Sequence, residues 1–468
     1  MENRVVIVGG GLAGLAAAAA LAPRGCAVTL LEARPRWGGR ASSFVDQTTG
    51  ETIDNCQHVS MGCCTNFRHF CQSVGLDAYF QRERRLWFID EQGKTSVLRA
   101  AALPAPLHLA PAFVGLRFLS WHDKWNLARA LDRLARTGAA GGDEPFLEWL
   151  KRHGQSPAAI DRYWRIVLVS ALSETLDRIE TRHARKVFAD GFLAARSAWE
   201  VWLPTVPLAR LYGDKLQAWL QRQGVAARLQ CGVQRVCLAE GKVYGVELRG
   251  GEVVAADHVI LAVPHHLAPS LLPDSLHAHP DLAGITRLET APISSVHLWF
   301  DRPISPLRHA TFIGRLSQWM FNRALIQQPP VANPGSTGWY YQVVISASRE
   351  VIARPQEEVI RQVVGELAAI WPAAGAARLQ HARMVTEHKA VVSMVPGVEN
   401  LRPPQQSPLR GLQLAGDWTR TGWPSTMEGA VRSGYLAAEN ILRNMQQPAA
   451  LVQPDLPVAI LSKILWKL

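Results

Sequence analysis

Apolar residues first gather in a short continuous run near the start of the chain. Residues 5–8 read Val-Val-Ile-Val and predict a strand buried on both faces. Leucine and alanine fill residues 15–21, which predict a helix, and a second apolar run at 27–31 predicts the next strand. A strand, a helix and a second strand in this order are typical of the opening of a doubly wound α/β sheet.

The spacing of the apolar residues changes twice farther along the chain. From residue 104 to about residue 223 the period is helical, and seven of the 16 tryptophans lie there, so we expect a largely helical region. Strand-like alternation then returns. The other predicted elements are a hairpin at 85–98, strands at 226–236, 243–248, 253–263, 294–300, 338–346 and 411–415, and helices at 356–370 and 427–443.

The helix predicted at residues 121–136 has two different faces. One face is apolar and contains Trp121, Trp125, Ala128, Leu131 and Ala135. The other face is charged and contains Asp123, Lys124, Arg129, Arg133 and Arg136. Because an apolar stripe with helical spacing usually packs in a core, we expect the two tryptophans to be buried.

The turn after the first strand contains a glycine motif with the spacing of a dinucleotide site. Gly9, Gly11 and Gly14 form Gly-x-Gly-x-x-Gly, and Glu32 ends the next predicted strand. The glycines let a pyrophosphate approach the amides at the start of the helix, while Glu32 accepts hydrogen bonds from an adenosine ribose and disfavours the 2′-phosphate of NADP. A glycine turn that binds nothing is the structural alternative, and the complete strand, turn, helix and acidic residue argue against it.

Two further segments extend this site. The first segment follows Glu32 and combines glycines, which permit close approach of the backbone, with donors for a phosphate: Arg34, Gly38, Gly39 and Arg40. In the second, Gly416 and Asp417 end a strand and precede the helix predicted from Met427. Asp417 is suited to accept a hydrogen bond from a ribityl hydroxyl, and the helix N-terminus stabilises negative charge on a reduced flavin ring.

These motifs resemble those of the flavin-containing amine oxidase and carotenoid desaturase superfamily. Its members place an N-terminal dinucleotide motif and a C-terminal Gly-Asp motif around one FAD, and the resemblance spans residues 9–430. It implies an α/β fold with a Rossmann-like FAD-binding domain of the amine-oxidase (GR2) type, interwoven with a substrate domain of helices and a β-sheet. It also implies that Val236 contacts the adenine and that Met427 and Ala430 lie beside the flavin.

The same resemblance divides the chain into three parts. We expect a discontinuous FAD-binding domain from residues 1–90, 225–290 and 395–445. Residues 91–224 and 291–394 would form the substrate domain, and 446–468 would form a C-terminal tail.

Two departures from the amine oxidases argue against an amine substrate. Leu298 takes the place of the lysine that holds a water at flavin N5, and Thr426 takes the place of an aromatic residue of the amine cage. Segments 296–302 and 424–430 instead resemble plant-type carotenoid desaturases. Segments 53–66 and 169–174 resemble the hydroxysqualene dehydroxylases of bacterial hopanoid biosynthesis.

That closer resemblance implies an enzyme that reduces hydroxysqualene to squalene with reduced FAD. A carotenoid, phytoene or squalene desaturase that uses the fold in the oxidative direction is the alternative. A prenyl-lipid escort protein without flavin is the non-enzymatic alternative, and the complete C-terminal flavin motif argues against it.

Removing an allylic hydroxyl requires an acid, a pocket that tolerates a cation, and a hydride donor. The resemblance puts the loop of Asp54 and His58 beside the isoalloxazine, so these two are candidate acids, and Glu174 is a third from the helical region. The structural alternatives are a turn or cap for Asp54, a flavin contact for His58 and an ion pair for Glu174.

Charge and cysteine content restrict the kinds of molecule that we expect the protein to bind. The net charge of +11 favours an anionic partner, and because the chain has neither a dense basic block nor a nucleic-acid motif, we expect anionic lipid and no nucleic acid. The seven cysteines have no paired spacing, which indicates reduced thiols and no metal site.

The apolar sequence of the tail also suits a membrane. No apolar run is long enough to span a bilayer, but residues 458–468 place Lys463 and Lys467 on one face, with Trp466 and aliphatic residues around them. An interfacial anchor and a helix docked on its own domain are both open. We expect an enzyme of the cytoplasm that is peripheral on the inner face of the membrane.

Overall fold

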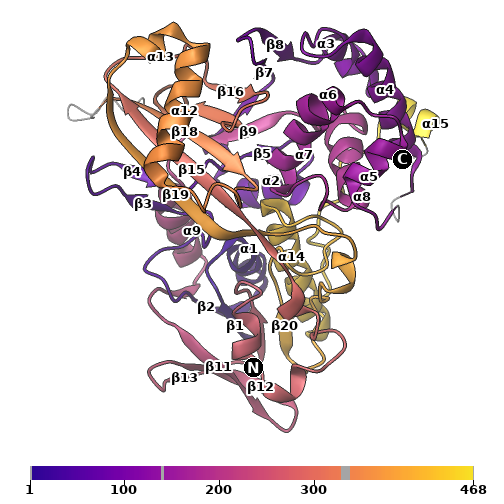
Figure 1. Ribbon diagram of the computed structural model, residues 1–468. Helices are drawn as coiled ribbons and strands as arrows, with labels where there is room; N and C mark the ends of the chain where they lie inside the picture. The colour runs from indigo at the N-terminus through magenta and orange to yellow at the C-terminus, as the bar shows by residue number, and fades with distance from the viewer. Residues whose placement is uncertain (1–2, 139–141, 328–337, 467–468) are drawn as a thin grey trace.

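The computed structural model describes residues 3–138, 142–327 and 338–466, and two large β-sheets organise it (Figure 1). One sheet, in the lower half of Figure 1, is parallel and contains the glycine-rich turn. The other lies above it and is flanked by the helical region on one side and by a long helix on the other.

The lower sheet has five parallel strands in the order β10-β2-β1-β14-β20. These strands are β1 (Asn3–Val8), β2 (Cys26–Leu31), β10 (Ala226–Arg228), β14 (His258–Leu261) and β20 (Leu412–Leu414). Apolar side chains cover both faces, as an all-parallel sheet requires. One face packs against helices α1 (Leu12–Leu21) and α14 (Met427–Asn444), and the other against the meander β11 (Val233–Ala239), β12 (Lys242–Leu248) and β13 (Val253–Ala255).

Helices α1 and α14 approach unusually closely. Every residue of α1 is buried, and seven of its ten residues are alanine or glycine. A Cβ added at Gly434 of α14 would collide with the carbonyl of Ala13, and one added at Gly14 with the carbonyl of Gly9. Glycine at these positions therefore sets the distance between the two helices and between α1 and the turn.

The predicted opening strand, helix and strand are confirmed, but two of the later strands are divided. The segment predicted at 226–236 forms β10 and β11, which belong to different sheets, and Gln230 between them has a φ of +56°. The segment predicted at 253–263 likewise forms β13 and β14. Apolar residues lie on both sides of each break, so the pattern does not show where the chain passes from one sheet to another.

The upper sheet has seven strands in the order β19-β15-β18-β17-β16-β7-β8. These are β7 (Leu86–Ile89), β8 (Thr95–Leu98), β15 (Thr290–Phe300), β16 (His309–Phe312), β17 (Trp319–Asn322), β18 (Trp339–Ser346) and β19 (Leu379–Val392). The predicted hairpin is confirmed as β7 and β8. Because β7 pairs with this sheet, the change from the lower to the upper part of the molecule falls before residue 86. Helix α12 (Gln356–Ile370) covers one face.

The helical region packs around aromatic side chains. Its helices include α3 (Ala110–Val114), α4 (Trp121–Arg136), α5 (Phe146–Arg152), α7 (Arg165–Leu172) and α8 (Thr181–Phe188). Helix α9 (Leu216–Arg222) lies in the same stretch of sequence but packs with α1 in the core of the lower sheet. Phe146, Trp164 and Phe188 meet edge to face at the centre, with ring centroids 5.4 and 4.8 Å from that of Trp164.

The expectation that the tryptophans of α4 are buried is wrong. Trp121 and Trp125 are 71% and 66% exposed, whereas Leu127 and Leu134 face the core. Asp123 points inward because Ser120 and Ser156 donate hydrogen bonds to its carboxylate, and the Nζ of Lys124 donates to the carbonyl of Val114 at 2.7 Å. Since these two polar groups have partners inside, the helix turns its aromatic residues outward.

The C-terminal helix α15 (Ile460–Trp466) docks on its own chain. The indole Nε1 of Trp466 donates to Asp132 on α4 at 2.8 Å, and the hydroxyl of Ser462 donates to the carbonyl of Leu193 at 2.8 Å. Lys467 lies outside the described residues. Among the helices of the described ranges, none is both long and apolar enough to cross a membrane.

Candidate active site

The turn between β1 and α1 has the geometry of a phosphate cradle. Gly9 has a φ of +112°, and an added Cβ there would lie 2.6 Å from the carbonyl oxygen of Ala262. Above Gly11 the space is open, because an added Cβ would meet no atom within 4 Å. No side chain caps α1, and its first turn has no acidic residue. Its first amides thus face an open space suited to a pyrophosphate.

Glu32 lies where an adenosine ribose would be recognised. Its carboxylate is buried at the end of β2 and accepts hydrogen bonds from the amides of Gly10 at 2.7 Å and Arg34 at 2.8 Å. These two bonds fix the carboxylate and leave further lone pairs for a ribose hydroxyl. The amide of Cys231 donates to the Glu32 carbonyl at 2.9 Å, which brings the start of β11, and buried Val236 on it, to this end of the sheet.

The second glycine pair lies against the first turn. Gly38 and Gly39 have φ angles of +98° and +60°, and the amide of Gly38 donates to the carbonyl of Gly10 at 2.8 Å. An added Cβ at Gly39 would lie 3.1 Å from the Cα of Gly11. Two glycine segments about 30 residues apart thus form one backbone surface. The exposed Arg34 belongs to the second of these segments.

Arg40 and Asp417 form an ion pair although they are 377 residues apart. Arg40 also donates to the carbonyl of Ala390 at 2.8 Å, and the hydroxyl of Ser425 donates to Asp417. Burial opposes ionisation of Asp417, but the charge and hydrogen bond of Arg40, the hydrogen bond of Ser425 and the charge of Arg402 together hold its pKa below the usual value. The N-terminal and C-terminal flavin motifs therefore meet at one charged point.

The N-terminus of α14 lies directly after this point. Thr426 caps the helix by accepting a hydrogen bond from the amide of Gly429 at 3.2 Å, so it holds Met427 and Ala430 in place and is not part of an aromatic cage. Glu428 points away to helix α2 (Thr65–Ser73), where it accepts hydrogen bonds from the amides of Asn66 and Phe67.

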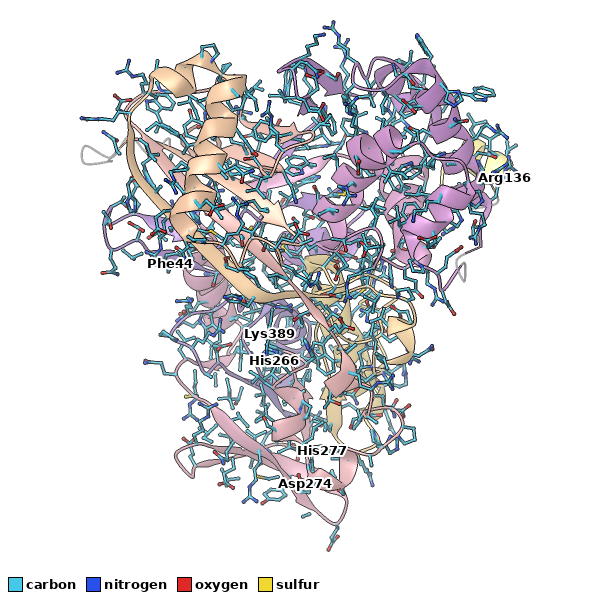
Figure 2. All side chains as sticks on the ribbon, viewed as in Figure 1. Phe44, Arg136, His266, Asp274, His277 and Lys389 are labelled. Carbon is cyan, nitrogen blue, oxygen red and sulfur yellow. The ribbon has the colours of Figure 1, made fainter. Side chains whose placement is uncertain are left out.

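Taken together, these residues fit FAD. The open space at α1 suits the pyrophosphate and Glu32 the ribose, and the start of α14 beside Asp417 suits the flavin end. Lys389 lies beside His266 in Figure 2, and burial, together with the charges of Lys389 and Arg40, lowers the pKa of His266. The cation on this side of the site is therefore Lys389, and a cation suits a ligand with two phosphates.

Asp54 is buried in a network of hydrogen bonds. Its carboxylate accepts from the hydroxyl of Ser43 at 2.7 Å and from the amide of Leu208 at 2.9 Å, and it forms an ion pair with Arg323 at 3.1 Å. Both members of that pair are almost completely buried. Arg323 also bonds the side chain of Gln57, so it fixes both ends of the segment before His58. These contacts favour a structural role for Asp54.

His58 is half-buried and differently placed. Its Nδ1 lies 3.0 Å from the carbonyl of Cys56, and because a carbonyl only accepts, Nδ1 carries a proton. Burial lowers the pKa of His58. The neighbouring Asn55 donates from Nδ2 to the carbonyl of Arg40 at 2.6 Å, which ties this loop to the ion pair of Arg40 and Asp417.

Glu174 lies in a third environment, at the end of α7. Its carboxylate is fully buried and accepts two hydrogen bonds from Arg349, at 2.5 and 2.7 Å. Burial opposes its ionisation, but the bonds from Arg349 lower its pKa below the usual value. Arg349 also donates to the carbonyl of Thr290 and to the hydroxyl of Ser393, so the pair joins the helical region to the upper sheet.

Strand β15 bears on the choice between amines and hydrocarbons. Leu298 packs with Val296 and Phe300 against α12, on the far side of the sheet from the flavin motifs. No lysine occurs in β15 on either face. The absence of lysine therefore still argues against an amine oxidase, although Leu298 is not the residue that faces the site.

Several buried polar residues near Asp54 were missed in the sequence. Besides Arg323, they include Gln342, whose side chain donates to Ser295 at 2.9 Å, and His297, whose Nδ1 lies 2.7 Å from the hydroxyl of Tyr340. Gln342 and His297 each interrupt a run of apolar residues in a strand, whereas Arg323 begins a short helix, Arg323–Ile326. The two interruptions were the available signal, because a buried polar group needs a partner.

Comparisons with known proteins agree with this geometry. The family model described as flavin containing amine oxidoreductase matches residues 12–442. A 15-cis-phytoene desaturase of Solanum lycopersicum is 26% identical over 94% of this chain and 78% of its own, and a probable zeta-carotene desaturase of Synechococcus elongatus is 24% identical over 94% and 98%.

Solved structures share the fold at lower identity. An oxidoreductase of Methanosarcina mazei has a TM-score of 0.72 at 17% identity, over 95% of this chain and 100% of the other. Cyclohexylamine oxidase of Brevibacterium oxydans has a TM-score of 0.69 at 19% identity, also over 95% and 100%. The α/β fold and the FAD cofactor expected from the sequence are thus confirmed, and the chain belongs to the flavin-containing amine oxidoreductase family.

Proposed function

We propose that this FAD-dependent oxidoreductase acts on a long linear isoprenoid and reduces hydroxysqualene to squalene. The observation that supports it best is the loop from Asp54 to His58. Asp54 is locked to Arg323, while His58 next to it stays half-buried, and Asn55 ties the loop to Arg40 in the flavin motif. This is the segment whose sequence resembles the hydroxysqualene dehydroxylases.

Apolar side chains beside this loop suit a hydrocarbon. Cys56, Val59, Ile293 and Trp319 are partly buried and pack against one buried apolar cluster, so some of their apolar atoms remain accessible near His58. Several of the relatives are named for phytoene and zeta-carotene, which are long isoprenoids. A site of this lining binds a hydrocarbon better than a charged amine.

In the proposed reaction, the C–O bond of the allylic alcohol breaks and the hydroxyl leaves with one proton as water. Reduced FAD supplies the hydride for the carbon that loses the hydroxyl. His58 is the proposed proton donor, because its imidazolium is a stronger acid when burial lowers its pKa. Asp54 acts as a positioning residue that fixes the segment before His58.

Desaturation is the second candidate. Its support is that the relatives at 24–26% identity are desaturases. In that direction the substrate would lose a hydride and a proton, and the same cofactor would become reduced.

The deciding experiment compares the two directions under anaerobic conditions. The protein is reduced with dithionite and incubated with hydroxysqualene; we expect the flavin absorbance of the oxidised state to return and gas chromatography to detect squalene. Oxidised protein incubated with phytoene or squalene should keep its absorbance. Bleaching by either hydrocarbon, without squalene formation from hydroxysqualene, would select desaturation.

The variant His58→Ala tests the proton donor in the same assay. It should keep its FAD and lose most of its turnover, since general acid catalysis contributes roughly 100-fold or more. In the wild-type protein, turnover should rise as the pH falls through the lowered pKa of His58, and this dependence should vanish in the variant. His277→Ala, an exposed histidine at the bottom of Figure 2, is the matched control. An unchanged pH profile in His58→Ala would remove His58 from this role.

The location of the enzyme follows from the same substrate. We propose that it works on the inner face of the cytoplasmic membrane, where a hydrocarbon of this length would be dissolved.

A further inference from the structure

Large apolar side chains are exposed on three neighbouring helices. Leu107 lies in the turn before α3 and Val114 at the end of α3, Trp121 and Trp125 lie on α4, and Ile460 and Ile464 lie on α15. Ile460 and Ile464 are 78% and 72% exposed. We call these six side chains the apolar rim. Solitary exposed apolar residues are common, but a group that includes two tryptophans marks an interaction surface.

Contacts join the three helices that carry the apolar rim. The Nζ of Lys124 donates to the carbonyl of Val114 and lies 4.7 Å from the centre of the Trp121 ring, which joins α3 to α4. The bond between Trp466 and Asp132 joins α4 to α15. In Figure 1 the three helices lie together at the upper right of the molecule.

Basic residues surround the apolar rim. The exposed cations on or beside these helices include Arg99, Arg117, Arg129, Arg133 and Lys463. The acidic residues of α4 do not offset them fully, because Asp123 is turned inward and Asp132 accepts hydrogen bonds from Arg136 and Trp466. Tryptophan beside arginine and lysine is the composition that favours the headgroup layer of an anionic membrane over a protein surface.

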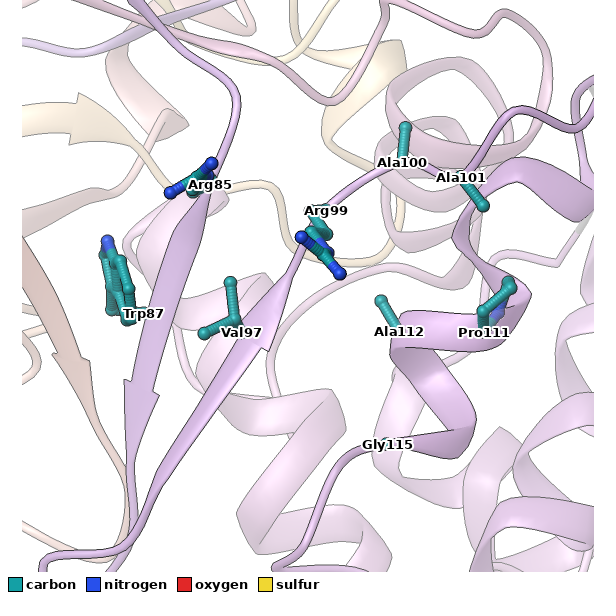
Figure 3. Close-up of a pocket in the computed structure, with 9 residues that line it drawn as sticks. All are labelled: Arg85, Trp87, Val97, Arg99, Ala100, Ala101, Pro111, Ala112 and Gly115. Carbon is teal, nitrogen blue, oxygen red and sulfur yellow. The ribbon is translucent and has the colours of Figure 1, made fainter.

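A pocket opens beside the apolar rim. It has a volume of about 680 Å³ and lies between the hairpin of β7 and β8 and helix α3, with Arg85 and Arg99 among apolar residues that include Trp87 and Ala112 (Figure 3). Its wall residue Ala100 packs on the same buried apolar cluster as Cys56 and Val59, which adjoin His58 in the sequence. One apolar cluster therefore connects the wall of the pocket with the loop of the proposed active site.

We propose that the apolar rim inserts into the headgroup layer of an anionic bilayer and that this pocket is where a membrane-dissolved substrate enters. Insertion of α3, α4 and α15 would bring the pocket mouth to the lipid, so the hydrocarbon would not cross water. The docking surface stands by itself; the entry route rests on the proposed function.

The docking surface is tested by co-sedimentation of the FAD-bound protein with vesicles and without substrate. Wild-type protein should bind vesicles of equal parts phosphatidylglycerol and phosphatidylcholine, and binding should weaken in phosphatidylcholine alone. The double variant Trp121→Ala and Trp125→Ala should bind the vesicles at least about tenfold more weakly, with FAD content and melting temperature unchanged. Tyr244→Ala with Val253→Ala removes two exposed apolar residues from β12 and β13, at the opposite end of the molecule, and should bind like the wild type.

The outcomes separate the two proposals. Wild-type protein that stays in the supernatant, or a double variant that binds as tightly as the wild type, would overturn the docking surface whatever the substrate. The entry route is tested by Ala112→Trp, which fills the pocket: it should bind vesicles normally and lose turnover of vesicle-borne hydroxysqualene. Full turnover in this variant would overturn the entry route, whereas no turnover by wild-type protein in vesicles or detergent would overturn only the proposed function.

Discussion

Helices α1 and α4 were both predicted from their apolar residues, yet they use those residues in opposite ways. In α1 all ten residues are buried, and glycine and alanine let it lie against α14 and the cofactor turn. In α4 the two largest apolar residues face outward, while an aspartate and a lysine are satisfied inside. The part of the molecule built on the lower sheet, called the nucleotide half below, is therefore held by close packing. The helical region instead exposes aromatic residues at its surface.

The two regions are also attached differently. The nucleotide half is built on a five-stranded sheet whose two faces are both covered by apolar side chains. The helical region contacts the upper sheet through apolar side chains such as Ile313 and Phe88, and also through the ion pair of buried Glu174 with half-buried Arg349. A contact made through charge responds to pH, and a contact made through packing responds to volume.

The largest expected effect is at the contact between α1 and α14. Gly434→Ala adds a Cβ that collides with the carbonyl of Ala13, so we expect the free energy of unfolding to fall by about 3 kcal/mol and FAD to be lost on purification. Denaturant unfolding and the flavin absorbance measure both. The matched control is Gly365→Ala in α12, where an added Cβ meets no atom, and which should stabilise by about 0.5–1 kcal/mol. Equal effects in the two variants would contradict close packing.

A smaller effect is expected at the buried ion pair. Glu174→Gln leaves Arg349 without its charged partner and should lower the free energy of unfolding by about 2 kcal/mol. Because the pKa of Glu174 is lowered in the folded protein, its contribution is present above the unfolded value of about 4.3 and is lost as the pH falls through the folded value.

The variant should therefore lose less stability than the wild type when the pH is lowered below that range, in denaturant titrations at several pH values. Glu148→Gln is the control, since Glu148 pairs with Lys151 on the surface and should matter by less than about 0.5 kcal/mol. Parallel pH curves for the wild type and Glu174→Gln would show that the helical region is not fastened by this charge.

The smallest effect is expected for the outward tryptophan. Trp125→Ala should change the free energy of unfolding by less than about 0.5 kcal/mol, because the side chain has little to lose in the folded state. Trp164→Ala, at the centre of the same region, should cost about 3–5 kcal/mol. Thermal unfolding of both variants measures the contrast. A large loss in Trp125→Ala would mean that α4 packs by its aromatic face after all.

The sequence predicts the cofactor-binding residues of the nucleotide half best. Gly9, Gly11 and Glu32 are constrained by local geometry, since a strand, a turn and a helix put them together within about 30 residues, and the order of the chain shows this directly. The pairing of Arg40 with Asp417 was not predicted, because each was assigned a ligand atom and neither motif specifies the distance between the two.

The sequence does not predict the features that depend on contacts between residues far apart in the chain. The outward rotation of α4 depends on Ser156 and Val114, which lie outside the helix and satisfy its two polar residues. The surroundings of Asp54 depend on Arg323, a residue 269 positions away that no local pattern connects to it. Residue type and a family resemblance therefore led to candidate acids that include a group with a structural ion pair.

The pairing order of the lower sheet also has a consequence for synthesis of the chain. β1 and β2 leave the ribosome first, but β14 joins β1 only after residue 258, and β20 completes the sheet at residue 412. Helix α14, which covers α1, is later still. Until then the first strands of the nascent protein expose an edge and an apolar face, so folding of this half is completed near the end of translation and is a natural point for a chaperone to act.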